Sequence, residues 1–135
     1  MDKSKARVFV LEDAEDRIKW FTQRFAENPV FVTVTNAQLA IEVLTLIEFD
    51  LLFLDHDLEL LNYAGGYMES QEESSGTGYD VAKFLEENPD CQRTAEIVIH
   101  SLNPSGTARM LAALKKSGER TVNAVSFLVL KELVG

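Results

Sequence analysis

Short apolar runs alternate along this chain with longer segments whose apolar residues recur at helical spacing. The short runs are rich in β-branched or aromatic residues, which predicts five strands, over residues 7–11, 30–35, 50–54, 96–99 and 121–125. The longer segments predict five helices, over residues 12–27, 36–47, 77–87, 104–117 and 126–134. Asn36 is the expected N-cap of the second helix, and Pro104 and Gly118 are expected to bound the fourth.

Strands that alternate with helices predict a parallel sheet covered on both faces. Five strand–helix units in 135 residues fit one α/β domain over residues 1–135, with a doubly wound, flavodoxin-like sheet. The usual strand order of this fold is 2-1-3-4-5, and ligands bind it at the carboxyl ends of the strands, near strands one and three.

One segment, residues 58–76, breaks the alternation. It has no helical or strand period and is acidic and rich in Gly and Ser. A loop of this length inside a compact domain is usually functional or disordered. Two interpretations stay open, a solvated insertion and a lid over a site at the end of the third strand.

Composition narrows the class of protein. Hydrophobic residues make up 46% and charged residues 26%, which are globular values. The net charge of −9 disfavours a DNA-binding role and permits a cation site built from carboxylates. The single cysteine, Cys91, excludes an intrachain disulfide and is expected to be inert. We see no secretory signal and no apolar stretch long enough for a membrane span, so we expect a soluble cytoplasmic protein.

Polar residues gather at three predicted strand ends, which meet at one edge of a parallel sheet. They are Glu12 and Asp13 after the first strand, Asp55, His56 and Asp57 after the third, and His100, Ser101 and Asn103 after the fourth. Converging carboxylates repel one another and need a cation or shifted pKa values. Their hard oxygen ligands suit Mg²⁺ or Mn²⁺.

Each of these residues also has a simpler interpretation. Glu12 and Asp13 suit the positive start of a helix, Asp57 suits a turn, and each histidine alone suits an ordinary hydrogen-bonded loop position. Asp55 is harder to dismiss, because a charge directly after a buried apolar run needs a partner. The convergence of all of them favours a site.

This pattern resembles the response-regulator receiver domain over nearly the whole chain. Glu12-Asp13 matches its Mg²⁺-binding pair, residues 50–55 match its third strand with Asp55 as the phospho-accepting aspartate, residues 78–81 match the helix start that follows, and Ser101 matches a phosphate-contacting residue. The chain departs from that pattern after the fifth strand, where Val125-Ser126-Phe127 stands in place of Lys-Pro-Phe. The resemblance alone therefore leaves stable phosphorylation of Asp55 open.

A narrower resemblance is to the cyclic-phosphate processing receiver domain family. It is carried by Glu12-Asp13 with Asp16-Arg17, by residues 55–58, and by His100-Ser101 with Asn103. The resemblance implies a metal-dependent phosphoesterase that acts on a small-molecule or nucleotide cyclic phosphate.

In that hypothesis the residues have distinct roles. The metal ligands are Glu12, Asp13, Asp55 and Asp57. His56 and His100 are the general acid and base, with Asp55 as an alternative covalent nucleophile. Ser101 and Asn103 bind phosphate oxygens.

Two alternatives stay open beside the enzyme. The first is an atypical receiver that regulates a separate protein partner, with or without phosphorylation of Asp55. The second is a degenerate receiver scaffold used for protein contact alone, which predicts no Mg²⁺ binding. The sequence also leaves open whether the chain forms a homodimer.

Overall fold

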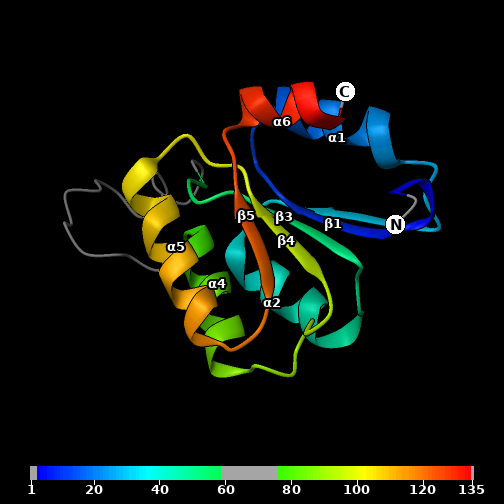
Figure 1. Cartoon of the computed structure of the whole chain (residues 1–135). Coiled ribbons are helices and arrows are strands. Elements are labelled where there is room, and N and C mark those ends of the chain that lie inside the picture. The colour runs from blue at the N-terminus through cyan, green and yellow to red at the C-terminus, as the bar shows by residue number, and fades with distance from the viewer. Residues whose placement is uncertain (1–2, 59–75, 135) are drawn as a thin grey trace.

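The structure is a computed structural model that describes residues 3–58 and 76–134. Its five strands are β1 (Arg7–Leu11), β2 (Val30–Val34), β3 (Leu51–Leu54), β4 (Glu96–Ile99) and β5 (Thr121–Ala124). They form one parallel sheet in the order β2-β1-β3-β4-β5, which confirms the predicted doubly wound, flavodoxin-like fold (Figure 1).

Helices cover both faces of this sheet (Figure 1). On one face lie α2 (Ala37–Leu46), α4 (Gly78–Glu87) and α5 (Pro104–Lys116), and on the other lie α1 (Glu15–Phe25) and α6 (Phe127–Val134). A short 3₁₀ turn, η1 (Lys3–Lys5), precedes β1. Each face has its own apolar cluster: Leu52 and Ile97 face α2, α4 and α5, whereas Phe53 and Val98 face α1 and α6.

The predicted helix boundaries agree with the observed ones to within three residues. Asn36 caps α2 as expected, because its side chain accepts a hydrogen bond from the Leu39 backbone N–H. Thr77 caps α4 in the same manner. The largest difference is at α1, which begins at Glu15 rather than at residue 12, because the Glu12 side chain accepts hydrogen bonds from the backbone N–H groups just before the helix.

The register of the sheet places the carboxyl ends of β1, β3 and β4 at the same level. Leu11 pairs with Leu54, and Leu54 pairs with Ile99. The residues that follow these three in the chain are therefore neighbours at the carboxyl edge of the central strands.

The predicted loop lies mostly outside the described residues. Of residues 58–76, the structure describes only Leu58, which is completely buried, and Gly76, whose backbone N–H donates to Asp80. The two interpretations of this loop remain predictions. Among the described helices, none combines the length and the apolar character that crossing a membrane would need.

Candidate metal and phosphate site

A cavity of about 190 Å³ opens at the carboxyl ends of β1 and β3, and we call it the acidic pocket. All four carboxylates that the sequence assigns to a metal border it. Its lining consists of Glu12, Asp13, Ala14, Arg17, Asp55, Asp57 and Leu102. The structure therefore places the predicted metal ligands around one space.

Glu12 follows β1 directly and is completely buried. Its Oε2 atom accepts hydrogen bonds from the backbone N–H groups of Asp13 and Ala14, at 3.1 and 3.0 Å. These N–H groups stand just before α1, so the carboxylate satisfies donors at the start of the helix. This local cap explains why α1 begins three residues later than the spacing predicts. It also fixes Glu12 with its other oxygen, Oε1, turned toward the interior of the site.

Asp55 follows β3, the central strand, and is only 2% exposed. Its Oδ1 atom accepts a hydrogen bond from the His56 backbone N–H at 2.9 Å. Burial, and then the nearby charge of Glu12, raise the pKa of Asp55 to about 7, although Arg17 opposes this shift. Gly78 at the start of α4 allows the close approach of the helix here, because a Cβ on Gly78 would overlap the Asp55 carbonyl oxygen.

His100 lies beside Glu12 and is not among the residues that line the acidic pocket. Its Nε2 atom is 2.8 Å from Glu12 Oε1, and neither side chain is exposed. The imidazole ring packs against Phe21, Phe53 and Phe127, with ring centroids 5.2 to 6.5 Å apart. Burial lowers the pKa of His100, which favours the neutral ring at pH 7. Nε2–H then donates to Glu12, because a carboxylate oxygen can only accept, and Nδ1 has no hydrogen-bond partner among the described residues.

His56, Asp57 and Asn103 form a second polar cluster beside the acidic pocket. His56 Nδ1 lies 2.8 Å from Asp57 Oδ1, and the Asn103 amide donates to the same oxygen at 3.1 Å. The His56 side chain is only 6% exposed, whereas Asp57 is half exposed and reaches the pocket. The hydrogen bond from His56 lowers the pKa of Asp57.

The residues predicted to bind phosphate oxygens have partners within the protein. The Ser101 hydroxyl accepts a hydrogen bond from the Asn103 backbone N–H at 3.0 Å. Asn103 is the N-cap of α5, since its Oδ1 atom accepts from the Gly106 backbone N–H at 2.9 Å. Neither side chain borders the acidic pocket, so direct contact with a phosphate remains a prediction for both.

Arg17 is the site residue to which the sequence analysis assigned no role. Its Nη1 atom lies 3.5 Å from Glu12 Oε1 and 3.7 Å from Asp55 Oδ2. The arginine follows the acidic pair by one turn of the predicted helix. That spacing was the available indication that it could reach back to the pocket.

The donor set fits a divalent cation. One ligand atom each from Glu12, Asp55 and His100 lies within 4.8 Å of the other two. Carboxylate oxygens suit Mg²⁺ and Mn²⁺, and Glu12 and Asp55 supply them, whereas the Nε2 atom of His100 is already engaged with Glu12. The guanidinium of Arg17 already meets one oxygen of each acid, so the pair attracts positive charge at this point.

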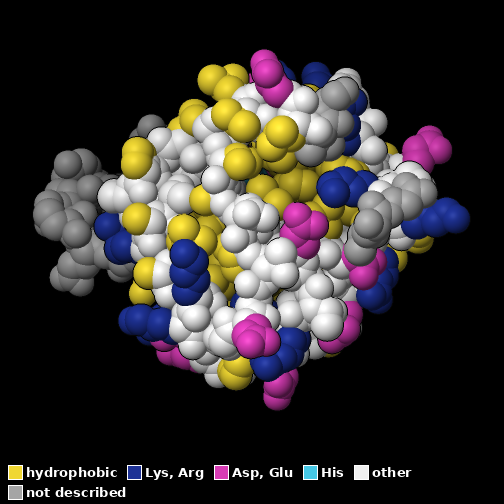
Figure 2. Space-filling model, viewed as in Figure 1, with side chains coloured by type: hydrophobic (Ala, Val, Ile, Leu, Met, Phe, Trp, Pro, Cys, Tyr) yellow, Lys and Arg dark blue, Asp and Glu magenta, His cyan; other side chains and the backbone are white. Residues whose placement is uncertain are grey.

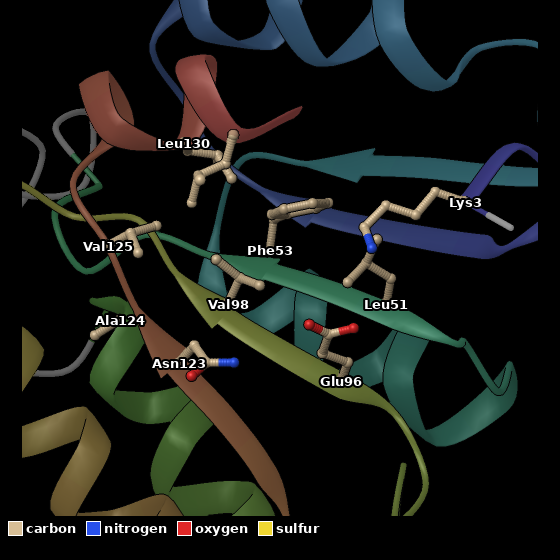
Figure 3. Close-up of a pocket in the computed structure, with 10 residues that line it drawn as sticks. Lys3, Leu51, Phe53, Glu96, Val98, Asn123, Ala124, Val125 and Leu130 are labelled. Carbon is tan, nitrogen blue, oxygen red and sulfur yellow. The ribbon is translucent and has the colours of Figure 1, made fainter. Parts of the chain in front are cut away.

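A larger cavity of about 380 Å³ lies elsewhere, on the face of β3, β4 and β5 beneath α6. Figure 3 shows its mainly apolar lining, including Phe53, Val98 and Leu130, and Figure 2 shows hydrophobic side chains gathered on this face. It contains none of the polar residues at the strand ends. The candidate site is therefore the acidic pocket.

Comparisons with known proteins agree with this fold. The family model of the cyclic-phosphate processing receiver domain matches residues 8–116, so the chain belongs to this family of receiver domains. A search of curated protein sequences found no match.

Solved receiver domains share the same architecture. The receiver domain of a signal transduction histidine kinase from Syntrophus aciditrophicus is 19% identical, with a TM-score of 0.59, and the match covers 96% of this chain and 86% of that one. The receiver domain of the Francisella response regulator 1452 is 19% identical, with a TM-score of 0.58 and coverage of 96% and 93%. At this identity the likeness establishes the fold alone.

Proposed function

We propose that this protein is a receiver-type phosphorylation module in which Asp55 accepts a phosphoryl group beside a divalent cation. The observation that carries the proposal is the position of Asp55, which follows the central strand directly and borders the acidic pocket. The solved structures with this fold are described as receiver domains of a histidine kinase and a response regulator, and this description favours a signalling role over a hydrolytic one. A separate protein would then be the partner that responds to the phosphorylated state.

The chain's own groups prepare Asp55 for this role. The His56 N–H holds Oδ1, while Oδ2 is the oxygen nearest Arg17. With acetyl phosphate as the donor, a carboxylate oxygen of Asp55 bonds to phosphorus as the bond from phosphorus to the leaving acetate breaks. Glu12, Asp13 and Asp55 would hold Mg²⁺ or Mn²⁺, which would offset the negative charge of the phosphate.

The burial of His100 also favours this proposal. A general base must reach the water that it activates, directly or through one other water. His100 is fully buried, faces Glu12 and does not border the pocket. We therefore assign it to the positioning of Glu12.

Labelling with acetyl phosphate and Mg²⁺ tests the proposal, with the product measured by intact mass and the site located by peptide fragmentation. We expect one phosphoryl group on Asp55, lost with EDTA and in Asp55→Asn. Asp50→Asn is the matched control, because Asp50 precedes β3 as Asp55 follows it, and it should label normally. An unlabelled wild-type protein, or labelling that survives Asp55→Asn, would contradict the proposal.

A second candidate, hydrolysis of a cyclic phosphate, is favoured by the His56–Asp57 pair beside the pocket and by the description of the family. Asp57 would orient the His56 ring and support it as a base toward water. Water would add across one phosphorus–oxygen ester bond, which opens the ring to a phosphate monoester and a hydroxyl group.

A panel of nucleotide and small-molecule cyclic phosphates, incubated with Mg²⁺ or Mn²⁺, tests this candidate by product mass. If the protein is a hydrolase, turnover should be lost with EDTA, in Asp13→Ala and in His56→Ala. His100→Gln, which keeps a donor for Glu12, should retain it. No turnover across the panel would reject this candidate and leave the phosphorylation proposal intact.

A further inference from the structure

Arg17 connects the two most buried acids of the site. Its guanidinium spans Glu12 Oε1 and Asp55 Oδ2 at 3.5 and 3.7 Å, and its side chain is 23% exposed. The same group lies 5.6 Å from the centre of the Phe127 ring, which supports it from α6. Arg17 thus lines the acidic pocket together with both acids.

The ion pairs with Glu12 and Asp55 do not use the hydrogen-bond donors of the Arg17 guanidinium. A guanidinium carries five N–H donors in a planar fork that matches carboxylates and phosphates. Within residues 3–58 and 76–134, the structure records ion pairs from Arg17 to Glu12 and Asp55 but no hydrogen bond to either. Both distances exceed the 2.7–2.9 Å that is typical of a charge-assisted hydrogen bond. The fork therefore keeps its donors for an anion in the pocket.

The two carboxylate oxygens that meet Arg17 are also the ones that a divalent cation would use. Glu12 Oε2 is already held by two backbone N–H groups, and Asp55 Oδ1 by a third. Oε1 and Oδ2 are the oxygens that meet Arg17, and Oε1 also accepts a hydrogen bond from His100 Nε2 at 2.8 Å. Two cations at the same oxygens repel each other strongly where water is largely excluded. Arg17 and a divalent cation are thus alternatives at this point.

We propose that Arg17 is the anion-binding residue of this pocket and exchanges partners. Its guanidinium pairs with Glu12 and Asp55, and turns to the oxygens of a phosphate group when a divalent cation is bound to those acids. The phosphate half of this inference rests on the proposed function, whereas the competition with the cation does not. The exchange would give the pocket a positive side chain although Val125-Ser126-Phe127 after β5 contains no lysine.

A Mn²⁺ titration at pH 8 tests the competition, with free Mn²⁺ measured by electron paramagnetic resonance. Arg17→Gln should bind Mn²⁺ about tenfold more tightly than the wild type, because the competing charge is gone. Arg24→Gln is the matched control: Arg24 also lies on α1, over the Trp20 ring at 5.1 Å, and does not line the pocket. It removes the same charge and should change the affinity less than about twofold. If Arg17→Gln bound Mn²⁺ as tightly as the wild type or more weakly, the proposed competition between Arg17 and the cation would be overturned.

Calorimetry with inorganic phosphate in saturating Mg²⁺ tests the anion-binding half. Arg17→Gln should weaken phosphate binding about tenfold, with partial recovery in Arg17→Lys and no change in Arg24→Gln. Thermal unfolding of each variant verifies that it is folded. Unchanged phosphate binding in folded Arg17→Gln would overturn this half. Failure of Asp55 labelling with both titrations as expected would instead reject the proposed function and retain the role of Arg17.

Discussion

The Nε2 atom of His100 lies 2.8 Å from Oε1 of Glu12, and both side chains are completely buried. The contact joins the end of β4 to the end of β1 across the end of β3, where Asp55 stands. A neutral imidazole that donates to a carboxylate fixes its orientation without adding a second charge. His100 therefore sets the position of the acid that also meets Arg17.

Replacement of His100 tests this positioning role. His100→Ala should lower the free energy of unfolding by about 2–4 kcal/mol, because it leaves a cavity among three aromatic rings and removes a partner of buried Glu12. His100→Gln keeps an N–H donor and should cost clearly less. Urea denaturation measures both changes. An alanine variant as stable as the wild type would show that the pair does not support the fold.

Stability should respond to pH through Asp55. Its pKa rises from 3.8 to about 7 on folding, so the native state binds the proton more tightly than the unfolded chain. The resulting stabilisation is present below about pH 4 and is lost as the pH rises toward 7. Asp55→Asn is neutral throughout, so its stability relative to the wild type should increase from pH 5 to pH 8, on the order of a few kcal/mol.

Urea denaturation at the two pH values in EDTA checks this trend. Asp50→Asn serves as the control, because hydrogen bonds from Arg7 lower the pKa of Asp50, and its difference from the wild type should be the same at pH 5 and pH 8. Its contribution is present above the unfolded pKa and is lost only in acid. The same difference between Asp55→Asn and the wild type at pH 5 and pH 8 would contradict the raised pKa of Asp55.

Gly106 and His56 should be coupled. A Cβ on Gly106 would lie 2.5 Å from Cγ of the His56 ring, so Gly106→Ala should cost about 1–3 kcal/mol of stability by overpacking. In a His56→Ala background the ring is gone. The same glycine change should then be neutral or stabilising, since alanine favours the helix. A double-mutant cycle by urea denaturation measures the coupling, and additive effects would contradict the contact.

Most of the fold could be predicted from the sequence because each element is encoded locally. Apolar runs and helical spacing identified the strands and helices, and turn residues such as Asn36 marked their limits. The start of α1 could not be placed in this way, since Glu12 folds back onto its own backbone and delays the helix. That contact depends on one side-chain conformation rather than on a period.

The sequence predicted which carboxylates meet at the site, but it predicted fewer of the side-chain contacts between them and their neighbours. Parallel strand ends meet at one edge, so Glu12 and Asp55 could be brought together by topology alone. The direction of His100 follows from alternation along β4: it comes two residues after Val98, which faces α1 and α6. The spacing of Arg17, one turn after the acidic pair, indicates that it could reach back, but its contact with both acids depends on a side-chain conformation that the spacing does not specify.

We propose that the acidic pocket holds a divalent cation at the two oxygens that Arg17 meets. The most direct measurement is an anomalous difference map from crystals of the protein soaked in Mn²⁺. We predict a peak bound by Glu12 and Asp55, with the guanidinium of Arg17 moved away from both. A map with no peak in the pocket, or with Arg17 still between the two acids beside a bound ion, would contradict the account.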